Sequence, residues 1–376
     1  MSRSSVIVDA VRSPMGVKNG RMIGIRSDDL ATQVVKALLE RNPGLDRDSV
    51  EDVVLGCAFP EHTQGMLVAR GVALMAGLPT ESGAKVVNRF CGSSMDAVHQ
   101  LSQAVIAGDL QCGIAIGVED MFGIPMGGYN PSFNPALVDL NYYIGMGETA
   151  EILASELEIS REEQEDFSVN SHVKALAAWK NGGYANEVVP VTNRDETIDR
   201  DEGPREPDVE KMRSLKPAFL KEGTITAATS SPVSIGAAAM IVCSEEFAAK
   251  HKLTARARIL SRAVSGVDWT RMGMGPIPAS ALALERAGKT ADAMDCIELN
   301  EAFAAQSLYV IKKTGWSPEK INVNGGAIAL GHPLGASGVR ILTTLVNVLE
   351  AQKGQLGLAT MCIGTGQGIS TVIERA

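Results

Sequence analysis

Two signals that would place a protein in a membrane are missing from this sequence. No apolar stretch free of charge is long enough to form a membrane helix. Near the start of the chain, Arg3, Asp9 and Arg12 interrupt the apolar run that a signal peptide would need. We therefore expect no membrane span and a cytoplasmic location.

Cysteine is scarce and is not arranged to bind a metal. The six cysteines form no CxxC pair and no Cys/His cluster with the spacing of metal ligands. In a reducing compartment they should be free thiols, so each one is a candidate either for catalysis or for core packing. No metal site is expected.

An excess of positive charge is also missing. The formal net charge is -9, which argues against broad binding to nucleic acids. A polyanionic ligand would therefore need a local basic patch. The sequence contains no GxxxxGK motif followed by Ser or Thr, and no GxGxxG between a strand and a helix, so hydrolysis of a nucleoside triphosphate is not expected.

The residues that are present favour a folded α/β enzyme. Hydrophobic residues make up 45% of the 376 positions, aromatic residues only 4%, and there are 38 glycines. This balance is typical of globular α/β proteins with many tight turns between strands and helices. The length indicates two or three domains, or a duplicated fold with a large core.

Apolar patterning predicts a βαβ unit in the first half of the chain. Strands are expected at 52–57 and 85–88, and the second of them enters a turn at Cys91. A helix should then run to Gly108, followed by a buried strand at 113–118. This order of elements is that of a parallel strand crossover.

The second half of the chain repeats this plan. Strands are predicted at 295–300, 321–324 and 357–362, with a helix near 337–349. We interpret the repeat as an internal duplication of one domain.

Residues 120–225 differ in composition from the two halves and predict an inserted lid over one end of the fold. A Gly/Pro/Asn-rich loop comes first, then an amphipathic helix capped by Ser160, then a charged surface stretch. We therefore expect an N-terminal domain of residues 1–119 with 226–247, a loop domain of residues 120–225, and a C-terminal domain of residues 248–376.

Cys91 is the first candidate for chemistry. A thiol at the start of a helix feels the positive end of the helix dipole and can accept hydrogen bonds from free amides, and both effects should lower its pKa. A small buried residue in a tight turn is an equally good reading of the position alone. The other cysteines within apolar runs are interpreted as core residues: Cys57, Cys112, Cys243 and Cys296.

Three further candidates follow predicted strands. His332 lies in a glycine-rich loop before a helix, whereas the other four histidines have ordinary helical or surface contexts. Cys362 leaves a strand into a second glycine-rich loop, and core packing is its alternative. Asn300 ends a strand beside Glu301, and its alternative is a helix N-cap.

The candidates should meet where open α/β sheets bind their ligands, at the ends of strands. Two cysteines, a histidine and an asparagine suit carbon–carbon bond chemistry. One thiolate would attack a carbonyl, the histidine would activate it, amide donors would hold the oxyanion, and the second thiol would exchange a proton at carbon.

The motifs VNRFCGSSMDA, MGPIPAS, LNEAFAAQ, NVNGGAIALGHPLGASG and MCIGTGQG occur in an order that resembles the thiolase family over the whole chain. The resemblance is to the degradative 3-ketoacyl-CoA thiolases, including the thiolase subunit of bacterial fatty-acid β-oxidation complexes. It implies a five-layered αβαβα fold made of two duplicated domains plus an inserted loop domain. It also implies 3-ketoacyl-CoA and coenzyme A as substrates with no permanently bound cofactor, a homodimer or tetramer, and a possible hydratase/dehydrogenase partner subunit.

The resemblance also assigns roles to individual residues. Cys91 matches the acylated nucleophile, and His332 matches the residue that activates it and helps to bind the thioester oxygen. Cys362 matches the acid/base that protonates the acetyl-CoA enolate and later deprotonates coenzyme A. Asn300 matches the residue that holds an oxyanion-hole water, and the amides of Cys91 and Gly364 match a second oxyanion hole.

The resemblance further implies contacts with coenzyme A for Arg205, near the adenine and phosphates, and for Ser231, near the pantetheine. A solvated charged face would give the same pattern as the basic patch formed by Arg205, Lys211, Arg213, Lys216 and Lys221. The loop at Ser231 departs from the family pattern at Pro232 and at Ile235, where the family usually has aspartate. Gly145 occupies the position where short-chain biosynthetic thiolases carry histidine, which favours the degradative branch.

Three alternatives stay open at the sequence level. The nearest is a biosynthetic acetoacetyl-CoA thiolase that runs the condensation. A decarboxylating ketoacyl synthase would also pair cysteine with histidine, but it has no need of Cys362. The third is a non-catalytic scaffold that binds coenzyme A or lipid.

Overall fold

The protein is described by a computed structural model that covers residues 3–376. Its first half forms one side of a large mixed sheet, with strand order β4-β3-β5-β8-β1. Strands β3, β4 and β5 run parallel, and β8 pairs antiparallel with both β5 and β1. The bounds are β1 (Ser5–Arg12), β3 (Asp52–Gly56), β4 (Gly83–Val87), β5 (Cys112–Asp120) and β8 (Ser234–Ser244).

The second half repeats this order in the remaining strands. They follow one another as β10-β11-β12-β9, with β10 and β11 parallel and the other pairs antiparallel. Their bounds are β9 (Ala257–Gly266), β10 (Cys296–Leu299), β11 (Leu356–Ile363) and β12 (Gln367–Arg375). The matching order confirms the predicted duplication.

The counterpart of β4 in the second half is reduced to one residue. Ile321 forms a single parallel bridge with Ile297, so the strand predicted at 321–324 is wrong. The Asn322 side chain makes the hydrogen bonds to β10 that a neighbouring strand would otherwise make. Its Oδ1 accepts from the Leu299 N–H at 2.9 Å, and its Nδ2 donates to the Leu299 carbonyl at 2.8 Å. Because these backbone groups are already bonded, the chain is free to turn, and Asn322 adopts a positive φ of 46°.

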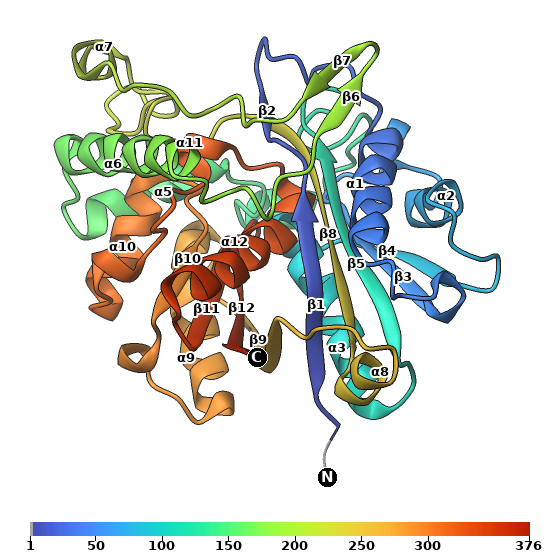
Figure 1. The fold of residues 1–376 in the computed structure, drawn as a ribbon. Coiled ribbons are helices and arrows are strands. Elements are labelled where there is room, and N and C mark those ends of the chain that lie inside the picture. The colour runs from blue at the N-terminus through green and yellow to red at the C-terminus, as the bar shows by residue number, and fades with distance from the viewer. Residues whose placement is uncertain (1–2) are drawn as a thin grey trace.

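The two halves join along β1 and β9 and enclose a layer of helices. Val6 pairs with Arg258 and Ile7 with Ala257, so the sheet is continuous across the junction. Helices α3 (Ser93–Ala107) and α12 (Ser337–Gln352) pack against each other between the two halves (Figure 1). The outer layers are α1 (Ser27–Arg41) with α2 (Val68–Met75), and α9 (Pro276–Ala287) with α10 (Ala304–Thr314). The five layers confirm the fold that the resemblance implies.

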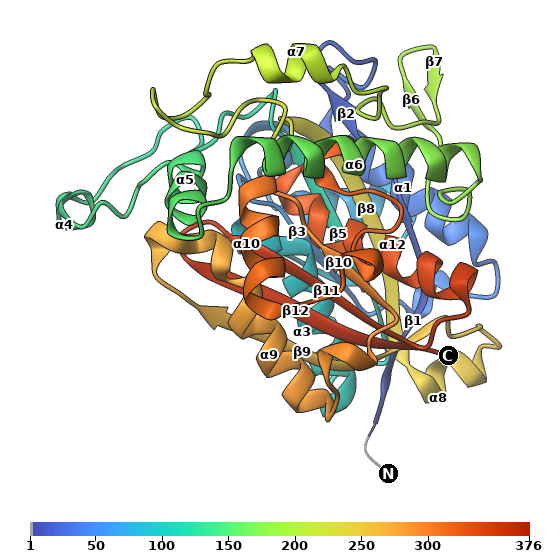
Figure 2. The same cartoon turned by 90° about the vertical axis from the view of Figure 1, so that its left-hand side faces the viewer.

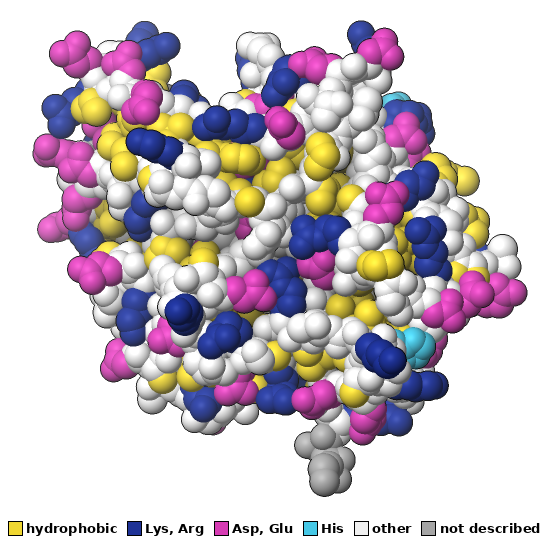
Figure 3. Space-filling model, in the orientation of Figure 1, with side chains coloured by type: hydrophobic (Ala, Val, Ile, Leu, Met, Phe, Trp, Pro, Cys, Tyr) yellow, Lys and Arg dark blue, Asp and Glu magenta, His cyan; other side chains and the backbone are white. Residues whose placement is uncertain are grey.

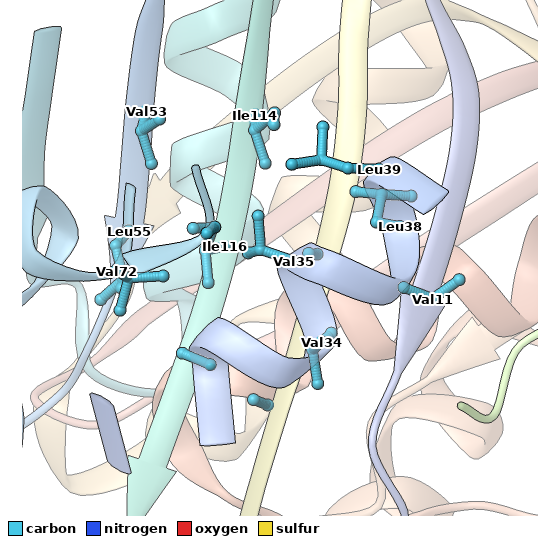
Figure 4. Close-up of a cluster of buried hydrophobic side chains, with 14 of the residues drawn as sticks. Val11, Val34, Val35, Leu38, Leu39, Val53, Leu55, Val72, Ile114 and Ile116 are labelled. Atoms are coloured by element: carbon cyan, nitrogen blue, oxygen red, sulfur yellow. The ribbon is translucent and has the colours of Figure 1, made fainter. Parts of the chain in front are cut away.

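The outer helix α1 shows why the elements pack in this way. Its apolar residues recur with helical spacing, so one face carries Val34, Val35 and Leu38, all without exposed surface. Figure 4 shows this face over the sheet, with Val35 near Ile116 of β5 and Leu38 toward Val11 of β1. Burying such a face removes aliphatic surface from water at about 25 cal/mol per Å², which fixes the helix on the sheet.

Residues between β5 and β8 cross over one end of the molecule. Figure 2 shows the long helix α6 spanning the C-terminal half, with α4 projecting from the body. The segment contains α4 (Pro135–Asp139), α5 (Met146–Glu156), α6 (Arg161–Lys180), β6 (Val191–Asn193), β7 (Glu196–Ile198) and α7 (Val209–Ser214). The shorter elements elsewhere are β2 (Gly16–Val17), α8 (Glu245–Lys250) and α11 (Ala327–Leu330).

Helix α6 confirms its predicted cap but not its predicted amphipathicity. Ser160 and Glu163 form a reciprocal capping box. The buried face, however, is made of small and polar residues, including Ser168, Ser171 and Ala175. This face contacts the rest of the protein partly through hydrogen bonds, such as that from the Ser171 hydroxyl to a Glu301 oxygen at 2.6 Å, so it needs no apolar stripe.

The predicted charged surface stretch is also partly wrong, because Asp201 is buried. Its carboxylate accepts two hydrogen bonds from the Arg12 guanidinium, at 2.6 and 2.9 Å. On the molecular face in Figure 3, basic and acidic side chains alternate without a continuous field of one sign. Within residues 3–376, no helix combines the length and the apolar character that crossing a bilayer requires.

Candidate active site

Four of the five residues predicted to take part in the chemistry line one cavity. Cys91, His332, Cys362 and Gly364 border a space of about 420 Å³, and the fifth, Asn300, lies directly behind His332. Cys91 belongs to the N-terminal half and the others to the C-terminal half. The cavity walls also include residues from the crossing segment and the loop before β8: Met121, Met126, Gly145, Met146, Phe219, Ser231, Pro232 and Val233.

A strained turn presents Cys91 at the start of α3. The chain leaves β4 and passes through Phe90, which has a φ of +43°, into a short 3₁₀ turn over Phe90–Gly92. The Ser93 side chain holds this turn, because its oxygen accepts from the Arg89 N–H at 2.9 Å and donates to the Phe90 carbonyl at 2.6 Å. Positive φ at a bulky residue costs of the order of 1–3 kcal/mol and clusters at functional sites.

The acidity of the Cys91 thiol differs from the sequence expectation. Burial raises its pKa to about 11, although the amides of Gly364 and of Cys91 itself act in the opposite direction. The carboxylate of Glu119 adds to the rise. Loss of solvation therefore outweighs the hydrogen-bond donors at the helix start, and the resting group is a neutral thiol rather than the expected thiolate.

His332 is held as a neutral imidazole. It follows Gly331, whose φ of +118° suits glycine, and its ring is buried. Nδ1 lies 2.6 Å from the hydroxyl of Ser337, which itself donates to the Pro333 carbonyl at 2.9 Å. Because Ser337 uses its proton on Pro333, Nδ1 must donate and Nε2 keeps its lone pair. Burial and the nearby Arg340 lower the pKa of His332 to about 3.

Cys362 and Gly364 lie at the hairpin between β11 and β12. Cys362 is almost fully buried, and burial raises the pKa of its thiol; ionisation of Cys91 would raise this pKa further. The two thiols are therefore electrostatically coupled. The Gly364 amide is directed at the Cys91 sulfur. The hairpin thus brings a second thiol and a backbone donor to the nucleophile.

Asn300 is not a helix N-cap, so that alternative is wrong. Helix α10 begins at Ala304 and its N-cap is Phe303. Nδ2 of Asn300 lies 3.4 Å from Nε2 of His332, and Oδ1 accepts from Nη2 of Arg340 at 3.4 Å. The side chain is fully buried, and its amide hydrogens are directed toward the imidazole at the cavity wall.

Two sequence profiles that describe the thiolase N-terminal domain and the thiolase C-terminal domain match residues 5–246 and 253–375. The chain belongs to the thiolase family. Among its relatives, the 3-ketoacyl-CoA thiolase of Shewanella loihica is 48% identical over 100% of both chains. The 3-ketoacyl-CoA thiolase of Vibrio vulnificus is 46% identical and covers 99% of this chain and 100% of its own.

Two solved structures have the same fold. Human mitochondrial 3-ketoacyl-CoA thiolase superposes with a TM-score of 0.93 at 35% identity, covering 100% of this chain and 99% of its own. Acetyl-CoA acetyltransferase from Bacillus anthracis superposes with a TM-score of 0.91 at 34% identity and the same coverage. The likeness extends to both halves of the molecule.

The two residues predicted to contact coenzyme A lie in different hollows of this thiolase fold. Ser231 lines the cavity of Cys91, where its hydroxyl donates to the Ala302 carbonyl at 3.0 Å. Arg205 borders a separate hollow of about 200 Å³ that also contains Lys211. Arg213 lies 3.8 Å from Glu162 and 3.9 Å from Glu165, so this member of the predicted basic patch is already paired.

The two departures from the family pattern have separate environments. Ile235 is fully buried in the hydrophobic cluster beneath α1, at the point where β8 meets β2. Its aliphatic side chain therefore contributes to the core. Pro232 lines the cavity with Ser231, so it shapes the wall of the site.

Sequence reasoning did not identify two residues that hold the site together. Glu119 accepts hydrogen bonds from the amides of Ala58, Phe59 and Gly335, which ties the loop after His332 to the N-terminal half. Ser337 holds the Nδ1 end of the His332 ring. Ser337 lies within a recognised motif and could have been found there, whereas nothing local in the sequence around Glu119 reveals its distant partners.

Proposed function

We propose that this protein is a degradative 3-ketoacyl-CoA thiolase of fatty-acid β-oxidation. It cleaves 3-ketoacyl-CoA with coenzyme A and releases acetyl-CoA and a shortened acyl-CoA. The observation that carries the proposal is the meeting of two cysteines, a neutral histidine and a buried asparagine around one cavity. Full-length relatives named 3-ketoacyl-CoA thiolase, at 46–48% identity, support the same reading.

In the first half-reaction, the Cys91 sulfur attacks the 3-keto carbon while its proton moves to Nε2 of His332. The bond between C2 and C3 then breaks, and its electrons leave as the enolate of acetyl-CoA. The Cys362 thiol protonates this enolate at C2. The unprotonated Nε2 and the neutral thiols of the resting site support this order, because no charge has to be buried before the substrate arrives.

In the second half-reaction, the Cys362 thiolate takes the proton of an incoming coenzyme A. The new thiolate attacks the acyl-enzyme carbonyl, and Cys91 leaves as a thiolate that takes back the proton held by His332. We assign the amides of Cys91 and Gly364 to the oxyanion of this step, and Asn300 to a water that helps His332 hold the thioester oxygen. A positioned acid or base typically contributes about 10²–10⁴-fold, and the loss of one oxyanion donor costs about 10²–10³-fold.

We propose that coenzyme A lies across the hollow of Arg205 and reaches the cavity of Cys91 with its pantetheine. Two chain segments connect these hollows. One segment runs from Met212 and Leu215, which border the Arg205 hollow, to Phe219, which borders the Cys91 cavity. The other runs from Ala228 at the Arg205 hollow to Ser231 at the Cys91 cavity. Arg205 would face the adenine and phosphates and Ser231 the pantetheine. Met121 and Met126 would line the path of the acyl chain.

We further propose that residues 120–225 act as a loop domain over the site, between an N-terminal domain (1–119 with 226–247) and a C-terminal domain (248–376). The enzyme would work in the cytoplasm without a permanently bound cofactor, as a homodimer or tetramer. Binding to a hydratase/dehydrogenase subunit would place it in a β-oxidation complex. The exposed outer edge of β4 supports pairing with a second copy.

The function is tested by measuring thiolysis of acetoacetyl-CoA and of 3-ketodecanoyl-CoA with free coenzyme A. We expect faster cleavage of the long substrate by the wild type and no turnover by Cys91→Ala. Cys362→Ala should still be acylated by an acyl-CoA but should not cleave the carbon–carbon bond. Near-wild-type thiolysis by Cys362→Ala would refute this division of labour.

Two other outcomes would select the alternatives. Activity on acetoacetyl-CoA alone would indicate a biosynthetic acetoacetyl-CoA thiolase, an acetyl-CoA C-acetyltransferase. No activity on either substrate would favour a scaffold that binds coenzyme A or lipid without turnover.

A further inference from the structure

A buried arginine lies directly behind the candidate active site. Arg340 belongs to α12 and is 1% exposed. Its Nη2 donates to Oδ1 of Asn300 at 3.4 Å, and its Nη1 lies 3.6 Å from a carboxylate oxygen of Glu298, which is also 1% exposed. Glu298 and Asn300 are two residues apart, so one guanidinium spans the end of β10.

The Asn300 contact is the only hydrogen bond of the Arg340 guanidinium within residues 3–376. Nε and Nη1 have no hydrogen-bond partner there, and neither has either oxygen of Glu298. The neighbouring buried arginine, Arg12, has its own partners, because it bonds to Glu187 at 2.7 Å and to Asp201 at 2.6 Å. Within residues 3–376, Glu298 is therefore the one carboxyl group within 4 Å of the Arg340 guanidinium, and burial raises the pKa of this carboxyl to about 8. A buried guanidinium with so few partners calls for an explanation.

The arrangement gives the hydrogen-bond chain a single direction. A guanidinium can only donate, so the Asn300 oxygen must face Arg340 and the Asn300 nitrogen must face His332. The nitrogen can only donate, so Nε2 of His332 must accept. At the other end of the ring, Nδ1 donates to Ser337, whose proton is used on the Pro333 carbonyl.

We propose that Arg340 is a positioning residue: by donating to Asn300 it fixes the orientation of that carboxamide, and through it the tautomer of His332 that can accept the Cys91 proton. The assignment of a proton acceptor rests on the proposed thiolase function, but the orientation itself does not. Without Arg340, the carboxamide could turn over and present its oxygen to Nε2. That arrangement favours the Nε2–H tautomer, in which the Ser337 hydroxyl turns from the Pro333 carbonyl to donate to Nδ1. The Nε2–H tautomer cannot take a proton from a thiol.

The test reads the tautomer directly, by nitrogen NMR of the enzyme labelled with ¹⁵N-histidine and without substrate. The chain has five histidines, so a His332→Gln spectrum assigns the resonance. We expect the wild type to show an unprotonated Nε2 and a protonated Nδ1. Arg340→Met should show a mixture of tautomers. Arg340→Lys should restore the wild-type form in part, because an ammonium group also only donates.

Kinetics supply the second readout. For Arg340→Met we expect the kcat of thiolysis to fall by about 10²-fold, the scale of one lost oxyanion-site donor, with little change in KM. Because this variant leaves Glu298 buried without a partner, the double variant Arg340→Met/Glu298→Gln removes both ionisable groups and tests the same step in a protein with less reason to unfold.

Three results decide the proposal. A wild-type spectrum with Nε2–H overturns it without any variant. A folded double variant that keeps both the wild-type tautomer and the wild-type kcat also overturns it. A mixture of tautomers in Arg340→Met or the double variant, partly reversed in Arg340→Lys, supports it. Because the spectra need no substrate, a wild type inactive on every ketoacyl-CoA would refute the thiolase function and leave the orientation of Asn300 to be decided by NMR.

Discussion

Two opposing effects act on the thiol of Cys91. The strained turn at Phe90 places it at a helix start with two amide donors, which favours thiolate, while burial in the cavity wall favours the thiol and prevails. Because His332 is also neutral, proton transfer between them creates both charges together and only as the substrate arrives. The resting site therefore resembles a protected nucleophile that forms its thiolate during attack.

Burial shifts the pKa of a second histidine that lies away from the proposed chemistry. His99 of α3 is 3% exposed, and its Nε2 lies 2.8 Å from the Thr371 hydroxyl. Burial, with a contribution from Arg262, lowers the pKa of His99 to about 3. In the unfolded chain its pKa is about 6.5, so between these values only the unfolded chain binds the proton. The stability contribution is fully present above about pH 6.5 and is lost as the pH falls toward 3.

We therefore expect His99→Gln, which keeps a hydrogen-bonding side chain, to make the protein less sensitive to acid. Between pH 7 and pH 5, the wild type should lose about 2 kcal/mol more of its free energy of unfolding than the variant, as measured by urea denaturation at both pH values. The matched control is His62→Gln at an exposed histidine, which should follow the wild type. Equal acid sensitivity of His99→Gln and the wild type would contradict this.

Sequence motifs show which residues form the site, but they do not show how far packing removes those residues from solvent. The motifs identified Cys91, His332, Asn300 and Cys362, and the structure brings them together. The direction of the Cys91 pKa shift was wrong, because the local sequence shows the helix start and its amide donors but not the packing that removes solvent. The local sequence also does not reveal the partners of Arg340, because Arg340 lies in α12 and its partners lie at the end of β10.

At the scale of elements, the site depends on the crossing of α3 and α12. Gly338 in the first turn of α12 meets the first turn of α3, and a Cβ added there would lie 2.2 Å from the backbone nitrogen of Met95. Backbone cannot move aside as a side-chain tip can. The glycine therefore allows the two helix starts, which follow Cys91 and His332, to approach closely.

We expect Gly338→Ala to separate these helix starts. Overpacking of this kind costs about 1–3 kcal/mol of stability, and the displacement of a reacting group by about 1 Å can cost 10²-fold in rate. Thermal denaturation and the kcat of thiolysis measure the two effects. Gly71→Ala in α2 is the matched control: no atom lies within 4 Å of its added Cβ, so it should gain about 0.4–1 kcal/mol. Unchanged stability and kcat in Gly338→Ala would show that the crossing tolerates a methyl group.

Elements were predictable where local patterning and packing agree. The strand at β5 and the helices α3 and α12 follow apolar repeats that the core then buries. The apolar residues around Ile321 also predicted a strand, but the Asn322 side chain bonds to the backbone of Leu299 and ends that strand. For α6 the partner surface is polar, so burial leaves no apolar stripe to predict it. In both places a distant partner decides the structure.

At the scale of the whole molecule, the duplicated sheet has two unlike edges. The β10 edge is buried, whereas β4 at the other end has exposed and partly exposed residues. Gly83 donates to the Glu51 carbonyl and Val87 accepts from the Cys57 amide, both toward β3. Because a strand alternates, Ala84 and Val86 direct their backbone groups outward. Helix α2 packs beside β4 and carries the exposed side chains Leu74 and Met75, and the exposed Met66 and Leu67 directly precede it.

An open edge flanked by apolar side chains is a surface that another strand can pair with, and the proposed homodimer would bring together the β4 strands of two copies. Ala84→Pro removes one outward N–H without touching the β3 ladder, so it should weaken the dimer. Ala84→Ser keeps the N–H and is the matched control. Sedimentation equilibrium should give twice the chain mass, or four times it for a tetramer, for the wild type and Ala84→Ser. For Ala84→Pro it should give a monomer or an oligomer that dissociates more readily. A monomeric wild type, or a proline variant that dimerises as tightly as the serine variant, would show that β4 is not the interface.

Because β4 leads through the turn at Phe90 to Cys91, loss of the dimer should also lower kcat.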